Sequence, residues 1–201
     1  MQYMDESVFT GFPKIPRWNR DIIITEKIDG TNAQILIPEN GPIVCKSGRE
    51  VPFLCGSRNR WVFPENDNHG FAKWAYSHVK ELLELGPGRH FGEWWGQGIQ
   101  RGYGVKEKRF SLFNTTKWTA ERPSCCHVVP MLYSGPMNFL AIEKTLGDLK
   151  ELGSFAAPTF MKPEGVVIYH VPSGHTYKIT LENDEKPKGV QDEAGTTRTT
   201  L

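Results

Sequence analysis

The pattern of apolar and polar positions predicts many strands with two helices inserted among them. Runs of β-branched residues predict strands at residues 21–27 and 32–38, and the Asp29-Gly30 dipeptide between them is typical of a hairpin turn. Apolar spacings of three and four predict helices at residues 71–85 and 139–152. Further strands are predicted at residues 42–46, 90–95, 110–113, 127–132, 166–171 and 176–181. Because helices do not alternate regularly with strands, we expect an α+β domain of antiparallel sheets flanked by a few helices.

Composition narrows the class of protein. The 201 residues are 38% hydrophobic and 23% charged, as in a folded globular domain. No apolar run reaches about 18 residues, so we expect no membrane span, and the N-terminus does not resemble a secretory signal. The cysteines show no metal-type spacing, which favours reduced thiols and a cytoplasmic location. We expect one domain at residues 1–183 and a polar tail at 184–201.

One segment carries a candidate nucleophile. Residues 26–32 read EKIDGTN, which places Lys27 at the end of a strand that is apolar before it. A neutral lysine amine is a good nucleophile, and burial favours the neutral form. Asp29 could orient this amine or help to position a metal ion. The four-residue K-x-D-G pattern alone is equally compatible with a surface hairpin that has a flanking lysine.

Five later segments also carry polar or aromatic residues beside apolar runs. They are GSRNRW with Arg58, HFGEWWG with Glu93, RFSLFN with Phe113, PEGVVIY with Glu164 and TYKIT with Lys178. Each has an ordinary explanation on its own, because loop arginines and edge glutamates are commonly solvated and strand phenylalanines commonly belong to the core. Their order along the chain is the informative feature.

In this order, the segments resemble the motifs of the covalent nucleotidyltransferases, which comprise polynucleotide ligases and mRNA-capping enzymes. EKIDGTN and the G-x-G-I-Q loop of FGEWWGQGIQRGYG most resemble ATP-dependent RNA ligases of the double-strand-sealing, RNA-editing type. The resemblance runs from about Pro13 to Lys188. It implies a nucleotidyltransferase domain with an ATP-grasp-like ligase fold. It also implies a covalent Lys27–AMP intermediate formed from ATP with Mg²⁺ (or Mn²⁺). The partner would be RNA with 5′-phosphate and 3′-OH ends, with a nicked duplex as one form of it.

The resemblance also implies roles for individual residues. The implied nucleotide-binding residues are Glu26, Lys27, Ile28, Asn32, Arg58, Glu93, Phe113, Glu164 and Lys178. The implied catalytic residues are Lys27, Asp29, Arg58, Glu93, Glu164 and Lys178. Phe113 would stack on adenine, Lys178 would contact the α-phosphate, and Arg58 and Glu93 would hold the ribose and the reacting end. Glu164 would organise metal-bound water, since Mg²⁺ keeps water and prefers oxygen ligands.

The sequence departs from that family in two places. Thr180 stands where the fifth motif usually has a second lysine, which Lys186 or Lys188 could replace. About 20 residues follow Leu181, so we expect a minimal form without a C-terminal domain. These departures keep open a small DNA ligase, a capping-type nucleotidyltransferase, and a non-catalytic RNA-end-binding module.

The net charge of +1 neither favours nor excludes nucleic-acid binding, because a basic patch can lie within a neutral total. Eight basic residues lie in the loops around the motifs, and we expect them to contact nucleic-acid phosphates. They are Lys46, Arg49, Arg58, Arg60, Arg101, Lys106, Lys108 and Arg109.

Overall fold

Two β-sheets organise the residues that the computed structural model describes, which are 9–67 and 69–185. The four-stranded sheet has the order β10-β1-β11-β12 and contains β1 (Asp21–Lys27), β10 (Met131–Pro136), β11 (Gly165–His170) and β12 (His175–Thr180). The six-stranded sheet has the order β6-β5-β2-β7-β8-β9 and contains β2 (Thr31–Ile37), β5 (Leu54–Gly56), β6 (Trp61–Val62), β7 (Gly88–Gly96), β8 (Lys108–Leu112) and β9 (Cys126–Val128). A small ribbon pairs β3 (Ile43–Val44) with β4 (Glu50–Val51).

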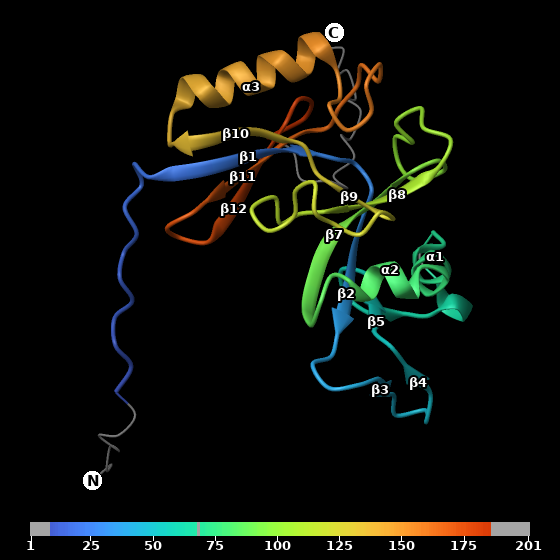
Figure 1. Ribbon diagram of the computed structural model, residues 1–201. Coiled ribbons are helices and arrows are strands. Elements are labelled where there is room, and N and C mark those ends of the chain that lie inside the picture. The colour runs from blue at the N-terminus through green and yellow to red at the C-terminus, as the bar shows by residue number, and fades with distance from the viewer. Residues whose placement is uncertain (1–8, 68, 186–201) are drawn as a thin grey trace, which may run out of the picture.

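Each sheet buries one face under helices (Figure 1). The helix α3 (Phe139–Leu152) packs on the four-stranded sheet, where Leu149 joins Ile24 and Val166 in one apolar cluster. The helices α1 (Phe71–Ser77) and α2 (Val79–Leu83) pack on the six-stranded sheet with a larger cluster that includes Trp94 and Phe110. The prediction of an α+β domain with antiparallel sheets is confirmed, and the pair β8–β9 is the parallel exception.

The predicted hairpin at Asp29-Gly30 is wrong. β1 pairs with β10 and β11, whereas β2 pairs with β5 and β7, so this turn carries the chain from one sheet to the other. Gly30 allows that crossing, because a Cβ there would lie 2.6 Å from the carbonyl oxygen of Trp94. The glycine signal was therefore real, but close packing against β7 explains it rather than a hairpin turn.

The predicted helix at residues 71–85 is divided at His78. The Ser77 hydroxyl donates a hydrogen bond of 2.7 Å to the Trp74 carbonyl, and His78 adopts a non-helical conformation. Such side-chain bonds compete with the helical backbone pattern. The helix predicted at 139–152 is confirmed, since Asn138 caps its first turn and Gly153, with a φ of 81°, follows its last residue.

The strand predicted at residues 127–132 is two strands in different sheets, β9 and β10. Pro130 separates them, because proline has no N–H to offer a ladder, while its carbonyl accepts a hydrogen bond from the Glu26 N–H. The final predicted hairpin is confirmed as β11 and β12. The short strands β4, β5 and β6 were not predicted.

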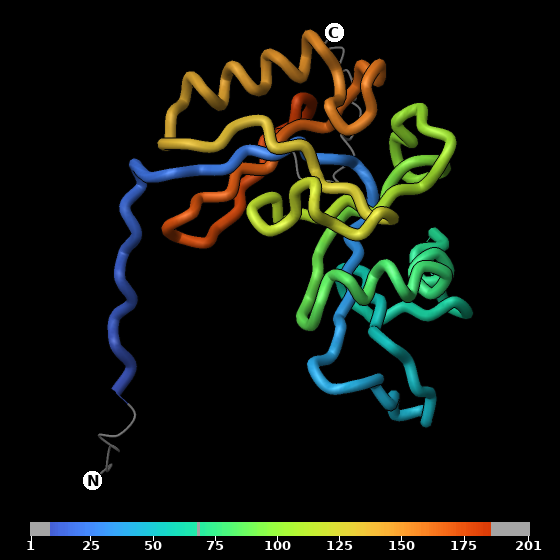
Figure 2. The backbone as a smooth tube through the Cα atoms, in the orientation of Figure 1, coloured from blue at the N-terminus to red at the C-terminus, as the bar shows by residue number. Residues whose placement is uncertain are grey.

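The N-terminal segment from residue 9 to the start of β1 contains no helix or strand, and it extends away from the sheets (Figure 2). The predicted tail lies almost entirely at residues 186–201, outside the described part of the chain. Within the described residues, no helix combines the length and apolarity needed to cross a bilayer.

Candidate active site

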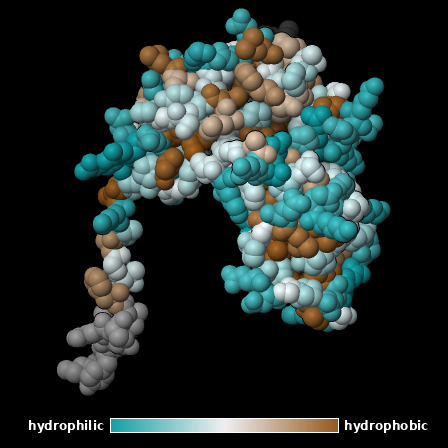
Figure 3. Space-filling model, viewed as in Figure 1, coloured by the Kyte–Doolittle hydropathy of each residue, from teal (hydrophilic) through white to brown (hydrophobic). Residues whose placement is uncertain are grey.

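A cleft of about 950 Å³ separates the exposed faces of the two sheets. The space-filling view shows the surface hollowed between the two halves of the molecule (Figure 3). From the four-stranded sheet come β1, β11 and β12, and from the six-stranded sheet come β2 and β7. The cleft brings together eight of the predicted site residues, which are Glu26, Lys27, Ile28, Asn32, Arg58, Glu93, Phe113 and Lys178.

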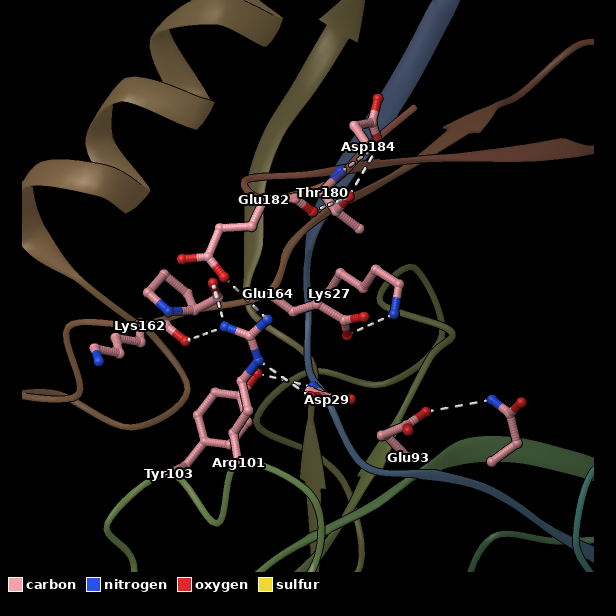
Figure 4. A network of polar contacts seen from close by, with 12 residues as sticks. Lys27, Asp29, Glu93, Arg101, Tyr103, Lys162, Glu164, Thr180, Glu182 and Asp184 are labelled. Carbon is pink, nitrogen blue, oxygen red and sulfur yellow. Dashed lines mark hydrogen bonds and ion pairs between the residues drawn. The ribbon is translucent and has the colours of Figure 1, made fainter. Parts of the chain in front are cut away.

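Lys27 lies at the end of β1 and faces this cleft. Successive side chains of a strand alternate between its faces, so the apolar cluster receives Ile22 and Ile24 and the cleft receives Lys27. The Lys27 Nζ donates a hydrogen bond of 2.6 Å to Oε2 of Glu164, which is 2% exposed (Figure 4). The buried carboxylate holds the amine in place, although 137 residues separate the two in sequence.

Glycine follows Glu164 for a steric reason. A Cβ on Gly165 would lie 2.1 Å from the Ile179 carbonyl oxygen, so any larger residue would push β11 away from β12. The backbone N–H of Leu181 also donates to the Glu164 carbonyl at 2.9 Å. Close strand packing thus positions the residue that contacts Lys27.

Glu93 and Asn32 form a second polar group on the opposite wall. They are directly paired across β2 and β7, and the Asn32 Nδ2 donates to Glu93 Oε2 at 3.3 Å. The Arg58 Nε donates to Asn32 Oδ1 at 2.7 Å, which connects the loop after β5 to this wall. Burial raises the pKa of Glu93 to about 7, and the positive charge of Lys27 partly opposes that shift. Glu93 can therefore exist as a neutral hydrogen-bond donor near neutral pH.

Asp29 lies on a smaller hollow of about 260 Å³ beside the main cleft. The Arg101 Nε lies 3.1 Å from Asp29 Oδ2, and the Arg101 Nη1 donates to the Lys162 carbonyl at 2.9 Å. The Asp29 N–H donates to the Tyr103 hydroxyl. Arg101 and Tyr103 come from the glycine-rich loop after β7, so this loop braces the turn that follows Lys27 (Figure 4).

The Glu26 side chain points to the other face of β1. Its carboxylate accepts hydrogen bonds from the Ser154 hydroxyl and from the backbone N–H groups of Phe155 and Ala156, at 2.6 to 2.9 Å. Burial raises its pKa. The side chain therefore secures the loop after α3 and leaves only the backbone of Glu26 available to a nucleotide. Ile28, which is 4% exposed, packs beside Trp95 at the junction of the sheets.

Phe113 and Lys178 line opposite sides of the cleft. Phe113 is 41% exposed, so it is not an ordinary core phenylalanine. Lys178 lies opposite Val167 in the ladder of β11 and β12 and is exposed. Thr180 turns to Asp184, whose carboxylate accepts its N–H at 2.7 Å, while Lys186 and Lys188 lie outside the described residues.

The structure separates the predicted basic group. Of the eight residues, Arg58 is the one that lines the cleft, and Arg101 forms an ion pair with Asp29. Arg49 and Arg109 are paired with Glu65 and Glu107. Two cations that we did not single out, Arg89 and Lys117, do line the cleft. Strand alternation could have revealed Arg89, because it lies four residues before Glu93 on the same face of β7.

The carboxylates around Lys27 fit a divalent cation that binds together with a nucleotide. The described residues contain no group of three or more His, Cys, Asp or Glu side chains placed to hold a metal ion. Glu164 and Asp29 nevertheless lie close enough to Glu93 for their negative charges to help raise its pKa. Mg²⁺ commonly binds one or two carboxylates and keeps water and substrate phosphates as its other ligands. This oxygen-donor set therefore fits Mg²⁺ or Mn²⁺ bound together with a nucleotide.

Comparison with known families identifies the chain. A family model described as RNA ligase matches residues 20–180. The chain therefore belongs to the RNA ligase family. A comparison with curated proteins finds no match.

Solved structures agree on the fold. An apo mutant of Naegleria gruberi RNA ligase superposes with a TM-score of 0.54 at 18% identity, over 81% of this chain and 50% of that one. A mutant of Naegleria gruberi RNA ligase with ATP and Mn gives a TM-score of 0.52 at 17% identity, over 80% and 48%. At such identities the likeness concerns the fold, and the chain spans about half the length of these structures.

Proposed function

We propose that this chain is an ATP-dependent RNA ligase of the double-strand-sealing, RNA-editing type, which forms a covalent lysyl-AMP at Lys27. The observation that carries the proposal is the position of Lys27. Its amine lies in the cleft between the two sheets, 2.6 Å from a buried carboxylate. The membership of the RNA ligase family and the ATP and Mn in solved relatives support the choice of nucleotide and metal.

In the first step, the Lys27 nitrogen attacks the α-phosphorus of ATP. The N–P bond forms, the bond from the α-phosphorus to the bridging oxygen breaks, and pyrophosphate leaves. The amine must lose a proton to become a nucleophile, and Glu164 Oε2 is in position to accept it. The same carboxylate could also organise metal-bound water. Mg²⁺ would neutralise phosphate charge, and Glu164 with Asp29 would hold it.

The two walls of the cleft divide the recognition of the nucleotide. Phe113, which follows β8 of the six-stranded sheet, offers an exposed ring for adenine. From the opposite wall, the backbone near Glu26 on β1 reads the amino group of the base. Neutral Glu93 would donate a hydrogen bond to a ribose hydroxyl, with Arg58 beside it. Lys178 on β12 would contact the α-phosphate from the other wall.

The later steps use the same cleft. AMP passes from Lys27 to the 5′-phosphate of an RNA, and an RNA 3′-OH then attacks that phosphate and releases AMP. Both transfers concentrate negative charge, so the cations of the cleft stabilise both transition states.

Labelling with ATP or GTP, followed by sealing assays, tests this function. We expect a covalent adduct from α-labelled ATP and none from GTP, and faster sealing of nicked RNA than of nicked DNA. A GTP adduct would indicate a capping-type enzyme, and preference for DNA a DNA ligase. Absence of any adduct would indicate a non-catalytic RNA-end-binding module.

A further inference from the structure

The exposed face of the six-stranded sheet carries a row of aromatic side chains beyond the proposed adenine pocket. Strand pairing places Trp61 opposite Gly56, Gly56 opposite Gln34, and Gln34 opposite Phe91. The backbone bond from the Phe113 N–H to the Phe91 carbonyl continues the row to Phe113. Directly paired residues project from the same face of a sheet, so all three rings lie on the cleft side.

The rings of this row are accessible. Phe91 is 52% exposed and Trp61 is 37% exposed, whereas the neighbouring Val62 is buried in the apolar cluster that includes residues of α1 and α2. Large apolar side chains on an open sheet face need an explanation, because burying them would stabilise the protein.

The Arg89 guanidinium lies near the rings of both Trp61 and Phe91. Its guanidinium carbon is 5.4 Å from the Trp61 ring centroid and 6.0 Å from that of Phe91, and its Nη1 donates to Gln34 Oε1. Guanidinium planes and aromatic rings both stack on nucleobases. Trp61, Arg89 and Phe91 therefore form a continuous surface, about three strand spacings or ~14 Å wide, next to the pocket that contains Phe113.

The charge around this surface favours a polyanion. Arg58, Arg60 and Arg89 form no ion pair with any other described residue, and Arg58 and Arg60 lie in the loop that precedes Trp61. Within β2, β5, β6 and β7, Glu93 is the one carboxylate on the cleft face. Stacking surfaces surrounded by cations are the usual combination for single-stranded nucleic acid.

We propose that Trp61, Arg89 and Phe91 bind the unpaired bases of the RNA strand that is being joined. This proposal rests on the proposed ligase function and deepens it. A paired base inside a duplex has no free face, so the surface binds bases of that strand that lie outside the duplex at the sealing site.

The test measures binding of a short 5′-phosphorylated oligoribonucleotide by fluorescence anisotropy, with the full chain at fixed salt. Trp61→Leu should weaken single-strand binding by about fivefold or more, the lower end of the range for base stacking. Trp61→Phe keeps a ring and should retain binding. Phe139→Leu, an exposed aromatic change on α3, is the matched control. Binding of a fully paired blunt duplex should not change in any variant.

Abasic substitutions identify the contact. Replacing single bases of the oligonucleotide by abasic riboses should weaken wild-type binding at one or two positions, and Trp61→Leu should be insensitive at those positions. Equal single-strand affinity of wild type and Trp61→Leu would overturn the proposal. Weaker binding by Trp61→Leu with the same abasic sensitivity as wild type would also overturn it, because Trp61 would then contact no base.

Adenylation by α-labelled ATP, measured without RNA, distinguishes failure of the proposed ligase function from failure of the stacking surface. Trp61→Leu should form the adduct as wild type does. If wild type forms none, the proposed function fails. If wild type forms the adduct and the RNA arm shows no effect of Trp61→Leu, only the stacking surface is wrong.

Discussion

At the scale of single residues, burial in the folded protein raises the pKa of Glu93, and this change can be tested. Its pKa of about 7 lies above the ordinary 4.5, mainly because burial disfavours the charged form. Between these pH values the folded protein binds more protons at Glu93 than the unfolded chain does. Its contribution to the free energy of unfolding is therefore fully present below pH 4.5 and is lost as the pH rises through 7.

Glu93→Gln tests this linkage, because glutamine keeps the shape and cannot ionise. We expect the variant to match wild type near pH 4.5 and to become more stable than wild type by about 1–3 kcal/mol above pH 7. Denaturant unfolding across this pH range measures the difference, and taking it against wild type removes the effect of Glu26. A constant difference at every pH would show that Glu93 does not titrate as described.

Phe113→Leu tests the stacking of adenine. Leucine keeps most of the apolar volume and loses the flat ring, so ATP affinity should fall by about 1–3 kcal/mol. The melting temperature should change little, because Phe113 is already partly exposed. Isothermal titration with ATP and thermal melting measure the two effects, with Phe139→Leu as the control. A lower melting temperature with unchanged ATP affinity would make Phe113 a packing residue.

At the scale of elements, the loop after α3 depends on the carboxylate of Glu26. Ser154→Ala removes a hydroxyl that donates to Glu26 at 2.6 Å and leaves that buried oxygen without this donor. We expect a loss of about 1–3 kcal/mol in the free energy of unfolding, with adenylation retained at temperatures where the protein is folded. Ser47→Ala, in an exposed loop, should change stability by less than about 0.5 kcal/mol. Equal stability of the two variants would contradict the role of Ser154.

Elements whose signals are local could be predicted from the sequence. The helix at 139–152 has its own cap and its own stop, and the hairpin of β11 and β12 contains its own turn. The sequence could not show that β1 and β2 belong to different sheets, since strand partners are chosen by long-range packing. Asp-Gly has the same local meaning in a hairpin turn and in a sheet crossing, and only the proximity of Trp94 distinguishes them.

For the candidate site too, the sequence could identify residues but not their long-range contacts. Ordered motifs pointed to Lys27, Glu93 and Phe113, and the structure brings all three into one cleft. Lys27 and Glu164 are 137 residues apart in sequence, so their spacing alone could not predict the contact between them. The same holds for Glu26, because the N–H donors that occupy its carboxylate belong to a loop 129 and 130 residues away.

At the scale of the whole molecule, each of the two sheets is covered by helices on one face, and the other faces of the two sheets line one cleft. In the proposed function, the four-stranded sheet supplies the nucleophile Lys27, the phosphate contact of Lys178 and the backbone near Glu26, and the six-stranded sheet supplies the ribose contacts and the ring of Phe113. If the two walls bind different parts of the nucleotide as proposed, the relative position of the sheets decides whether the amine reaches the α-phosphorus. The junction cluster of Ile28, Trp95 and Tyr103 holds that position.

The central claim is that Lys27 becomes covalently adenylylated. The most direct measurement is incubation with α-labelled ATP and Mg²⁺, followed by denaturing electrophoresis. Wild type should carry the label, and so should Lys144→Ala, which changes an exposed lysine on α3. Lys27→Ala and Lys27→Arg should carry none while melting as folded proteins, because alanine has no amine and a guanidinium stays protonated. Label that persists on either Lys27 variant, or no label on wild type, would contradict the account.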